Sequence, residues 1–285
     1  MDYAHPEALI ETDWLAEHLE DPEIRILDAS FFLPAMGRDA EIEFELRHIP
    51  GARRFDVNAV ADTATDLPHM LPDADFFAKT VGGMGIGNNT RVVVYDALGG
   101  FMAAMRAWWM FRVFGHDNVA VLNGGLVKWM NEERPVNKGF PPPHATQPYK
   151  AAFNKSLVRS LEEMKNNLDH KTEQVIDARS AGRFRGDDDE PRPTKFKGHI
   201  PDSINLPFND LLQPKKAFVM QPAKELKATF GYVGIDLDKP IAATCGSGVT
   251  ACVTAFGLYL IGKEDVSVYD GSWAEWGNRD DVPIA

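Results

Sequence analysis

The chain has 285 residues, two cysteines and a formal net charge of −12. A chain of this length forms one or two domains, and its 44% hydrophobic and 25% charged residues are typical of a folded globular protein. The acidic excess disfavours nucleic-acid binding, two cysteines are too few for a disulfide framework, and no apolar stretch is long enough to span a membrane.

The first half of the chain alternates short β-branched runs with helical patterns. Thr12 is a candidate N-cap, because a hydroxyl oxygen there accepts an unpaired backbone N–H. The predicted strands are Ile24–Leu27, Arg91–Tyr95 and Val119–Leu122, and the predicted helices are Thr12–Leu19, Ala74–Val81 and Ala103–Phe114.

A proline-rich stretch follows, from Arg134 to Lys155. Its five prolines fix backbone angles and remove N–H donors, which favours an extended connector over a packed element. We therefore expect a first domain over residues 1–133, a linker over 134–155 and a second domain over 156–285.

The second half repeats the alternation of the first. Ser160 is its candidate N-cap. The predicted strands are Gln174–Ile176, Ile241–Thr244 and Val266–Tyr269, and the predicted helices are Ser160–Leu168, Ala223–Phe230 and Thr250–Ile261.

The two halves are also similar in sequence. Short segments around Asp28, His48, Gly85 and Gly124 recur in the same order about 150 residues later, around Asp177, His199, Gly234 and Gly271. The chain is therefore predicted to be a duplicated α/β unit, each copy a mainly parallel sheet with helices on both faces. Because His48 and His199 occupy the same place in both copies, we expect them to stabilise the fold.

The segment Thr244-Cys245-Gly246-Ser247-Gly248-Val249-Thr250 carries the strongest chemical signal. A strand ends, a cysteine follows, and a helix begins after two glycines. The N–H groups of Gly246, Gly248, Val249 and Thr250 in such a turn are predicted to form an anion-binding cup. A thiol placed there ionises more readily, so Cys245 is the predicted nucleophile. The first copy has Asp96 and no cysteine at this turn, and Cys252 is expected in the core of the following helix.

Other chemistries fit this sequence less well. Gly246 to Ala251 also fits a dinucleotide-binding pattern, with Asp270 as its acidic residue, but the other copy lacks it. A cysteine phosphatase would need an arginine where Ala251 stands. No metal-binding spacing of Cys and His occurs, so we expect neither a metal nor a cofactor. The acidic run Asp187–Glu190 is expected to be a solvated loop.

The Cys-Gly-Ser-Gly-Val-Thr loop, Gly198-His199-Ile200-Pro201, Asp270-Gly271-Ser272-Trp273 and the first copy without a cysteine resemble the tandem rhodanese-domain sulfurtransferases over essentially the whole chain. Within that family the loop is similar to the group that uses 3-mercaptopyruvate, whereas the thiosulfate group carries basic residues after the cysteine. The resemblance implies two rhodanese-like domains, of which only the second is catalytic.

The resemblance also implies roles for single residues. Arg183 and Arg192 are expected to bind the substrate carboxylate, which suits the planar guanidinium. Ser247 and His69 are expected to handle protons in a triad-like arrangement. Where relatives place an aspartate behind the histidine, this chain has Asn58, with Asp62 as a weak substitute. Arg179 is expected to be structural.

The expected reaction moves sulfur from 3-mercaptopyruvate through a Cys245 persulfide to a thiol or cyanide acceptor, such as a small thiol or a thioredoxin-like protein. The alternatives are a thiosulfate sulfurtransferase, a non-enzymatic sulfur carrier and a dinucleotide-binding protein. The N-terminal sequence shows no secretory signal, and we expect a cytoplasmic location without membrane or nucleic-acid partners.

Overall fold

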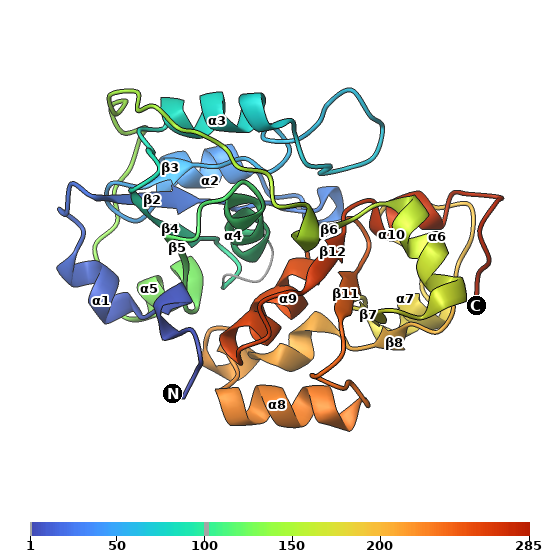
Figure 1. The fold of residues 1–285 in the computed structure, drawn as a ribbon. Helices are drawn as coiled ribbons and strands as arrows, with labels where there is room; N and C mark the ends of the chain where they lie inside the picture. Colours follow the sequence, from blue (N-terminus) through green and yellow to red (C-terminus); the bar gives the residue numbers. More distant parts are fainter. Residues whose placement is uncertain (1, 100–102) are drawn as a thin grey trace.

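The computed structural model describes residues 2–99 and 103–285, which form two α/β units, each built on its own sheet (Figure 1). The first unit has the strand order β1-β5-β4-β2-β3, and all its pairs are parallel. Its strands are β1 (Leu9–Ile10), β2 (Ile24–Asp28), β3 (Arg53–Arg54), β4 (Arg91–Tyr95) and β5 (Val119–Leu122). Its helices are α1 (Thr12–Glu17), α2 (Ala40–Leu46), α3 (Ala74–Gly83), α4 (Ala104–Val113) and α5 (Gly125–Asn131).

The second unit repeats this topology with the order β6-β12-β11-β7-β8, again parallel throughout. Its strands are β6 (Val158–Arg159), β7 (Gln174–Asp177), β8 (Ile204–Asn205), β11 (Ile241–Thr244) and β12 (Ser267–Tyr269). Its helices are α6 (Leu161–His170), α7 (Ala181–Arg185), α8 (Ala223–Tyr232), α9 (Ala251–Leu260) and α10 (Ser272–Trp276). A separate antiparallel pair joins β9 (Leu212–Gln213) to β10 (Val219–Met220). The predicted duplication and fold class are confirmed.

The central strands are buried on both faces, which explains their continuous apolar runs. In β4, Val92 and Val94 join the core beneath α3 and α4, whereas Val93 and Tyr95 join the cluster beneath α1, α2 and α5. Successive strand residues point to opposite faces, so helices on both sides are needed to cover them.

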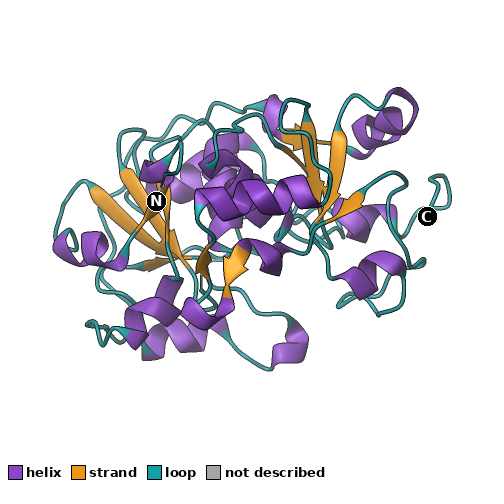
Figure 2. Ribbon diagram, turned by 90° about the horizontal axis from the view of Figure 1, so that it is seen from below, coloured by secondary structure: helices purple, strands orange, loops and turns teal. Residues whose placement is uncertain are grey.

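One apolar core runs from the first unit into the second. Helices lie between the two sheets (Figure 2), and α4 of the first unit packs on α9 of the second. The ring of Trp108 on α4 lies 4.7 Å from that of Phe256 on α9, in an edge-on arrangement. The two units therefore hold each other through a hydrophobic interface.

The predicted strands Arg91–Tyr95, Val119–Leu122 and Ile241–Thr244 have the observed bounds, and the six predicted helices form within three residues of their predicted ends. Ser160 is the N-cap of α6 and forms a capping box with Glu163, as predicted for that position. The prediction for Thr12 is wrong. Glu11 occupies the cap position of α1, and the Thr12 hydroxyl instead helps to lower the pKa of the Glu132 carboxyl.

The predicted linker is an extended segment that lies on the first unit. Residues 134–154 contain no helix, and their one isolated bridge pairs Asn137 with His48. The N–H of Ala152 donates to the Phe114 carbonyl at 3.0 Å. At the other end of the first unit, the N–H of Ala4 donates to the Leu260 carbonyl of the second at 2.8 Å.

No helix in the described ranges is both long and apolar enough to cross a membrane.

Candidate active site

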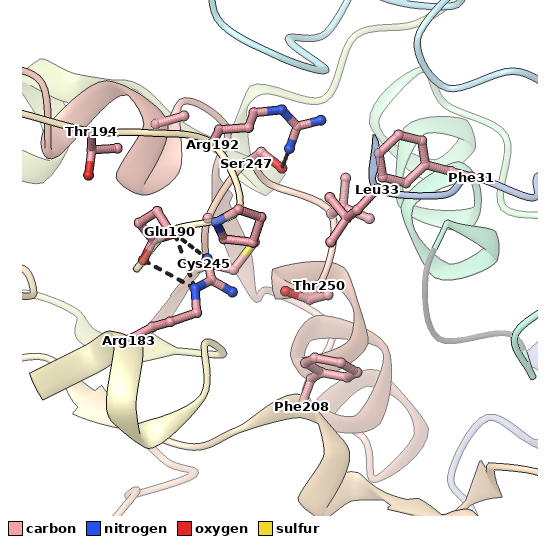
Figure 3. Close-up of a pocket in the computed structure, with 14 residues that line it drawn as sticks. Phe31, Leu33, Arg183, Glu190, Arg192, Thr194, Phe208, Cys245, Ser247 and Thr250 are labelled. Carbon is pink, nitrogen blue, oxygen red and sulfur yellow. Dashed lines mark hydrogen bonds and ion pairs between the residues drawn. The ribbon is translucent and has the colours of Figure 1, made fainter. Parts of the chain in front are cut away.

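A cavity of about 180 Å³ lies at the carboxyl end of β11, where the second unit meets the first (Figure 3). This is the edge of a parallel sheet at which ligands bind in open α/β folds. Its lining comes from both units: Phe31, Leu33, Arg183, Glu190, Pro191, Arg192, Thr194, Phe208, Cys245, Gly246, Ser247, Val249, Thr250 and Ala274.

Cys245 follows β11 directly and is 2% exposed. Its loop is held from below by α10, because the N–H of Trp273 donates to the Cys245 carbonyl and the N–H of Ala274 donates to the Gly246 carbonyl, both at 2.9 Å. The cysteine is therefore buried in a fixed loop and faces the cavity.

Ser272 shapes the same loop from the start of α10. Its hydroxyl oxygen accepts the N–H groups of Cys245 at 3.3 Å and of Gly248 at 3.0 Å, and donates to the Tyr269 carbonyl. Ser272 has a φ of 50°, close to the 52° of Gly125 at the matching position of the first unit. A serine in this left-handed conformation is strained, and its hydrogen bonds offset that cost.

These contacts correct the predicted anion cup. The N–H of Gly248 already donates to the hydroxyl oxygen of Ser272, so it is not available to an anion in the cup. Within the described chain, the N–H groups of Gly246, Ser247, Val249 and Thr250 have no protein acceptor. These four remain for an anion or for the charge of a sulfur attached to Cys245.

Both loop glycines lie close to neighbouring atoms, and the backbone requires a glycine at Gly248. Gly248 has a φ of 72°, and a Cβ atom there would lie 2.8 Å from the Asp270 carbonyl oxygen. A Cβ at Gly246 would lie 2.5 Å from Nη2 of Arg183. Gly246 therefore lets the Arg183 guanidinium lie against the catalytic loop.

Arg183 is held by Glu190. Its Nε donates to both carboxylate oxygens at 3.1 Å, and its Nη2 also contacts this carboxylate (Figure 3). Glu190 further pairs with Arg179 at 2.8 Å, and Arg179 pairs with Asp177 at 2.6 Å. The Glu190 side chain is only 7% exposed, so the expectation that residues 187–190 form a solvated loop is wrong for its last member. The buried Arg179 is structural, as expected.

Arg192 extends into the cavity on the other side of Cys245 (Figure 3). Its Nη2 lies 3.0 Å from Nε2 of His69, and its Nη1 lies 3.5 Å from Oγ of Ser247. An arginine always carries its protons, so the ring nitrogen of His69 is the acceptor. The structure thus brings Ser247, Arg192 and His69 together, with Arg192 between the other two.

His69 is buried and does not line the cavity. Burial, together with the charges of Arg192 and Arg106, lowers its pKa to about 3. The ring is therefore neutral at ordinary pH, with its proton on Nδ1. The expected direct contact between Ser247 and His69 is replaced by the arginine. Asn58 and Asp62 are exposed, and neither contacts His69 in the described part of the chain.

A link between the units that the sequence did not indicate lies behind this site. Arg106 of α4 is fully buried and forms an ion pair with Asp270 at 2.7 Å. Its guanidinium also donates to the carbonyl oxygens of Gly248, at 3.1 Å, and of His69. The signal for it in the sequence was an arginine in the middle of a mostly apolar helix pattern.

The first unit has a carboxylate where the second has its thiol. Asp96 follows β4 as Cys245 follows β11, and its side chain accepts the N–H groups of Leu98, Ala103 and Ala104 at 2.8 to 3.1 Å. In the first unit, Asp96 therefore occupies with its own carboxylate the place next to these N–H groups.

The remaining predicted residues have structural environments. Cys252 is fully buried on α9, and burial raises the pKa of its thiol. His48 stacks on Phe44 and His199 stacks on Phe184, and in both pairs Nδ1 of the histidine bonds the phenylalanine carbonyl at 2.9 Å. The expectation that these two histidines stabilise the fold agrees with this repeated arrangement.

Comparisons with known proteins find two related domains in this chain. The model of the Rhodanese-like domain matches residues 11–132 and 160–279. The human 3-mercaptopyruvate sulfurtransferase is 45% identical over 277 residues, covering 95% of this chain and 92% of that protein. The thiosulfate sulfurtransferase of Bos taurus is also 45% identical, over 281 residues, with the same coverage of both chains.

Solved structures agree with these similarities. A structure of SseA from Escherichia coli, described as a 3-mercaptopyruvate sulfotransferase, has 38% identity and a TM-score of 0.84, covering 94% of this chain and 99% of that one. A yeast mitochondrial sulfur transferase subunit has 33% identity and a TM-score of 0.87, covering 97% and 98%.

Proposed function

The chain belongs to the family of proteins with rhodanese-like domains, and we propose that it is a sulfurtransferase that takes sulfur from 3-mercaptopyruvate through a persulfide on Cys245. The observation that carries this proposal is the position of that thiol. It faces a cavity between two arginines, beside the free N–H groups of its own loop.

In the first step the Cys245 thiolate attacks the sulfur of the donor. A sulfur–sulfur bond forms, and the carbon–sulfur bond breaks with its electron pair moving to the carbon, which becomes the enolate of pyruvate. The proton of the new persulfide passes to that carbon, leaving pyruvate and a persulfide anion. The N–H groups of Gly246, Ser247, Val249 and Thr250 are suited to stabilise the negative charge on the outer sulfur.

Arg192 is the residue we assign to the donor carboxylate. It lines the cavity, and it has no carboxylate partner among the described residues. Arg183 lies on the opposite side, with Glu190 as its partner. Ser247 can donate to the donor carbonyl or to the enolate oxygen. His69 is a positioning residue in this scheme, because its neutral ring accepts a hydrogen bond from Arg192.

In the second step a thiolate acceptor attacks the outer sulfur. The acceptor gains a persulfide, and Cys245 leaves as a thiolate ready for another cycle. A small thiol or the thiol of a thioredoxin-like protein fits this chemistry. Both cysteines are unpaired, which suits a reducing compartment such as the cytoplasm.

Mercaptopyruvate is favoured over thiosulfate by the charges next to the sulfur. Relatives of both names are equally similar to this chain, so the choice rests on the site. Gly246 and Ser247 add no cation beside Cys245, and Arg183 is neutralised by Glu190. A compact dianion needs more positive charge there than a monocarboxylate does.

Intact-protein mass spectrometry after incubation with each donor tests the proposal. Mercaptopyruvate should add one sulfur atom to the wild type and to Cys252→Ala, and none to Cys245→Ser. Pyruvate should be released in equal amount. A chain that gains no sulfur from either donor, or gains it on Cys252, contradicts the proposal.

A non-enzymatic sulfur carrier is separated from an enzyme by turnover. With mercaptopyruvate and a small thiol both in excess, an enzyme releases many equivalents of pyruvate, whereas a carrier stops after one. The dinucleotide-binding alternative has no support in the site, because Asp270 is buried against Arg106 and is not exposed to a ribose.

A further inference from the structure

Glu190 controls the net charge of the cavity that Cys245 faces. Among the described residues that line this cavity, the charged ones are Arg183, Glu190 and Arg192. The Glu190 carboxylate pairs with Arg183 on one side and with Arg179, at 2.8 Å, on the other. It is 7% exposed, so water screens these charges weakly.

The charges next to Arg183 balance one another. Arg179 and Arg183 carry two positive charges, and Glu190 and Asp177 carry two negative ones, all linked by ion pairs. Arg192 stands apart, and in the described ranges no carboxylate pairs with it. Apart from the charge of the Cys245 thiolate, the cavity therefore has one uncompensated positive charge while Glu190 is ionised.

We propose that Glu190 is a specificity-determining residue, which neutralises Arg183 and so matches the cavity to a donor with one negative charge. This inference rests on the proposed function and explains its donor class. Mercaptopyruvate carries a single carboxylate, whereas thiosulfate carries two negative charges. A second unneutralised cation beside the sulfur would favour the dianion.

The pair is close enough to the reacting sulfur to have this effect. Gly246 follows Cys245, and a Cβ atom there would lie 2.5 Å from Nη2 of Arg183 and 3.6 Å from Oε2 of Glu190. The ion pair thus packs on the backbone of the catalytic loop itself. Its charge acts on the site at contact distance, unlike the exposed Asp187 on the same segment.

The test compares the two donors on one preparation of each variant, so that partial loss of folded protein cancels. Glu190→Gln keeps the shape of the side chain and frees the charge of Arg183. The ratio of kcat/KM for thiosulfate to that for mercaptopyruvate should rise about tenfold, or about 1.4 kcal/mol in relative barrier height. Arg183→Gln should move the same ratio in the opposite direction.

Two further variants separate charge from shape. The double variant Arg183→Gln, Glu190→Gln restores a single net positive charge, and its ratio should return toward that of the wild type. Asp187→Asn makes the same charge change at an exposed position and should leave the ratio unchanged, because solvent screens it. A Glu190→Gln ratio equal to that of the wild type overturns the inference and leaves the proposed function standing.

Alkylation of Cys245 gives a readout that needs no sulfur transfer. Iodoacetate is an anion and iodoacetamide is its neutral analogue, so the ratio of their rates reports the local charge. This ratio should rise about tenfold in Glu190→Gln. An unchanged ratio overturns the inference. An altered ratio in a protein that turns over neither donor upholds the effect of Glu190 on the cavity charge and contradicts the proposed function.

Discussion

Arg106 and Asp270 form a fully buried ion pair across the boundary between the two units, with 2.7 Å between Nη1 and Oδ1. The second oxygen of Asp270 accepts the N–H of Leu71 at 2.7 Å, and Arg106 holds the carbonyl oxygens of Gly248 and His69. The unit without a nucleophile thereby fixes both the catalytic loop and the segment that presents His69.

Loss of this pair should affect both stability and catalysis. Arg106→Gln leaves Asp270 as a buried charge without its partner, which costs about 3–5 kcal/mol in the free energy of unfolding. The exposed arginine in Arg279→Gln is the matched control, for which less than about 1 kcal/mol is expected. Urea denaturation measures both, and equal losses in the two variants would contradict a structural role for the pair.

Replacing His69 should weaken donor binding more than the chemical step. His69→Leu removes the acceptor for Arg192, so KM for mercaptopyruvate should rise about tenfold, the effect of one charge-assisted hydrogen bond. The value of kcat should change much less. His69→Gln, which offers an oxygen acceptor, should recover part of the loss. A variant with normal KM and a much lower kcat would instead assign proton transfer to His69.

The buried neutral ring of His69 makes stability depend on pH. Its pKa is about 3 in the folded chain and near 6.5 in the unfolded one, so the unfolded chain binds the extra proton between these values. The stability that the neutral ring contributes is complete above pH 6.5 and declines as the pH falls toward 3. At pH 5 the loss is about 2 kcal/mol.

A difference measurement isolates this contribution. The gap in free energy of unfolding between wild type and His69→Gln should fall by about 2 kcal/mol on going from pH 7.5 to pH 5. His170→Gln replaces an exposed histidine on α6 and serves as the matched control for a His-to-Gln change elsewhere in the chain. A gap for His69→Gln that does not change with pH would contradict the lowered pKa of its ring.

Ser272 should matter for reactivity as well as for folding. Ser272→Ala leaves the N–H groups of Cys245 and Gly248 buried without an acceptor, at a cost of about 1–3 kcal/mol each. Ser272→Gly suits the φ of 50° and still lacks the hydroxyl. Iodoacetamide should therefore alkylate Cys245 more slowly in both variants, while the glycine variant unfolds at higher urea concentration than the alanine variant. Wild-type alkylation rates would show that Ser272 does not position Cys245.

The sequence predicted the elements that carry enough residues to show a period. Arg91–Tyr95 is a run of β-branched residues closed by polar positions, so its bounds are clear. The edge strands β1, β3, β6 and β8 have two residues each, and no pattern can be seen in two residues. Thr12 was predicted as a cap because a threonine at the start of a helical pattern is typical of that position. The sequence does not show that the fold brings Glu132 to its hydroxyl.

The candidate site was predictable where it is local and unpredictable where it depends on contacts between distant segments. The Cys245 turn is one continuous segment between a strand and a helix. The partners of Arg192 come from positions far away in the chain, and only the fold shows that His69 meets the arginine and not Ser247. The burial of Glu190 could not be predicted either, because it depends on contacts with other segments. Its neighbours Asp187 to Asp189 in the same acidic run are exposed.

The carboxylate of Asp96 gives the duplicated architecture a thermodynamic asymmetry. In the first unit, the N–H groups of Leu98, Ala103 and Ala104 are satisfied by a carboxylate of the chain itself. In the second unit the corresponding loop has four such groups open until an anion or a persulfide arrives. The carboxylate of Asp96 thus takes the place that a bound anion would have in the second unit. The second unit is held to the first through Arg106. The stability of the first unit therefore helps to keep the catalytic loop in its reactive conformation when no anion is bound to it.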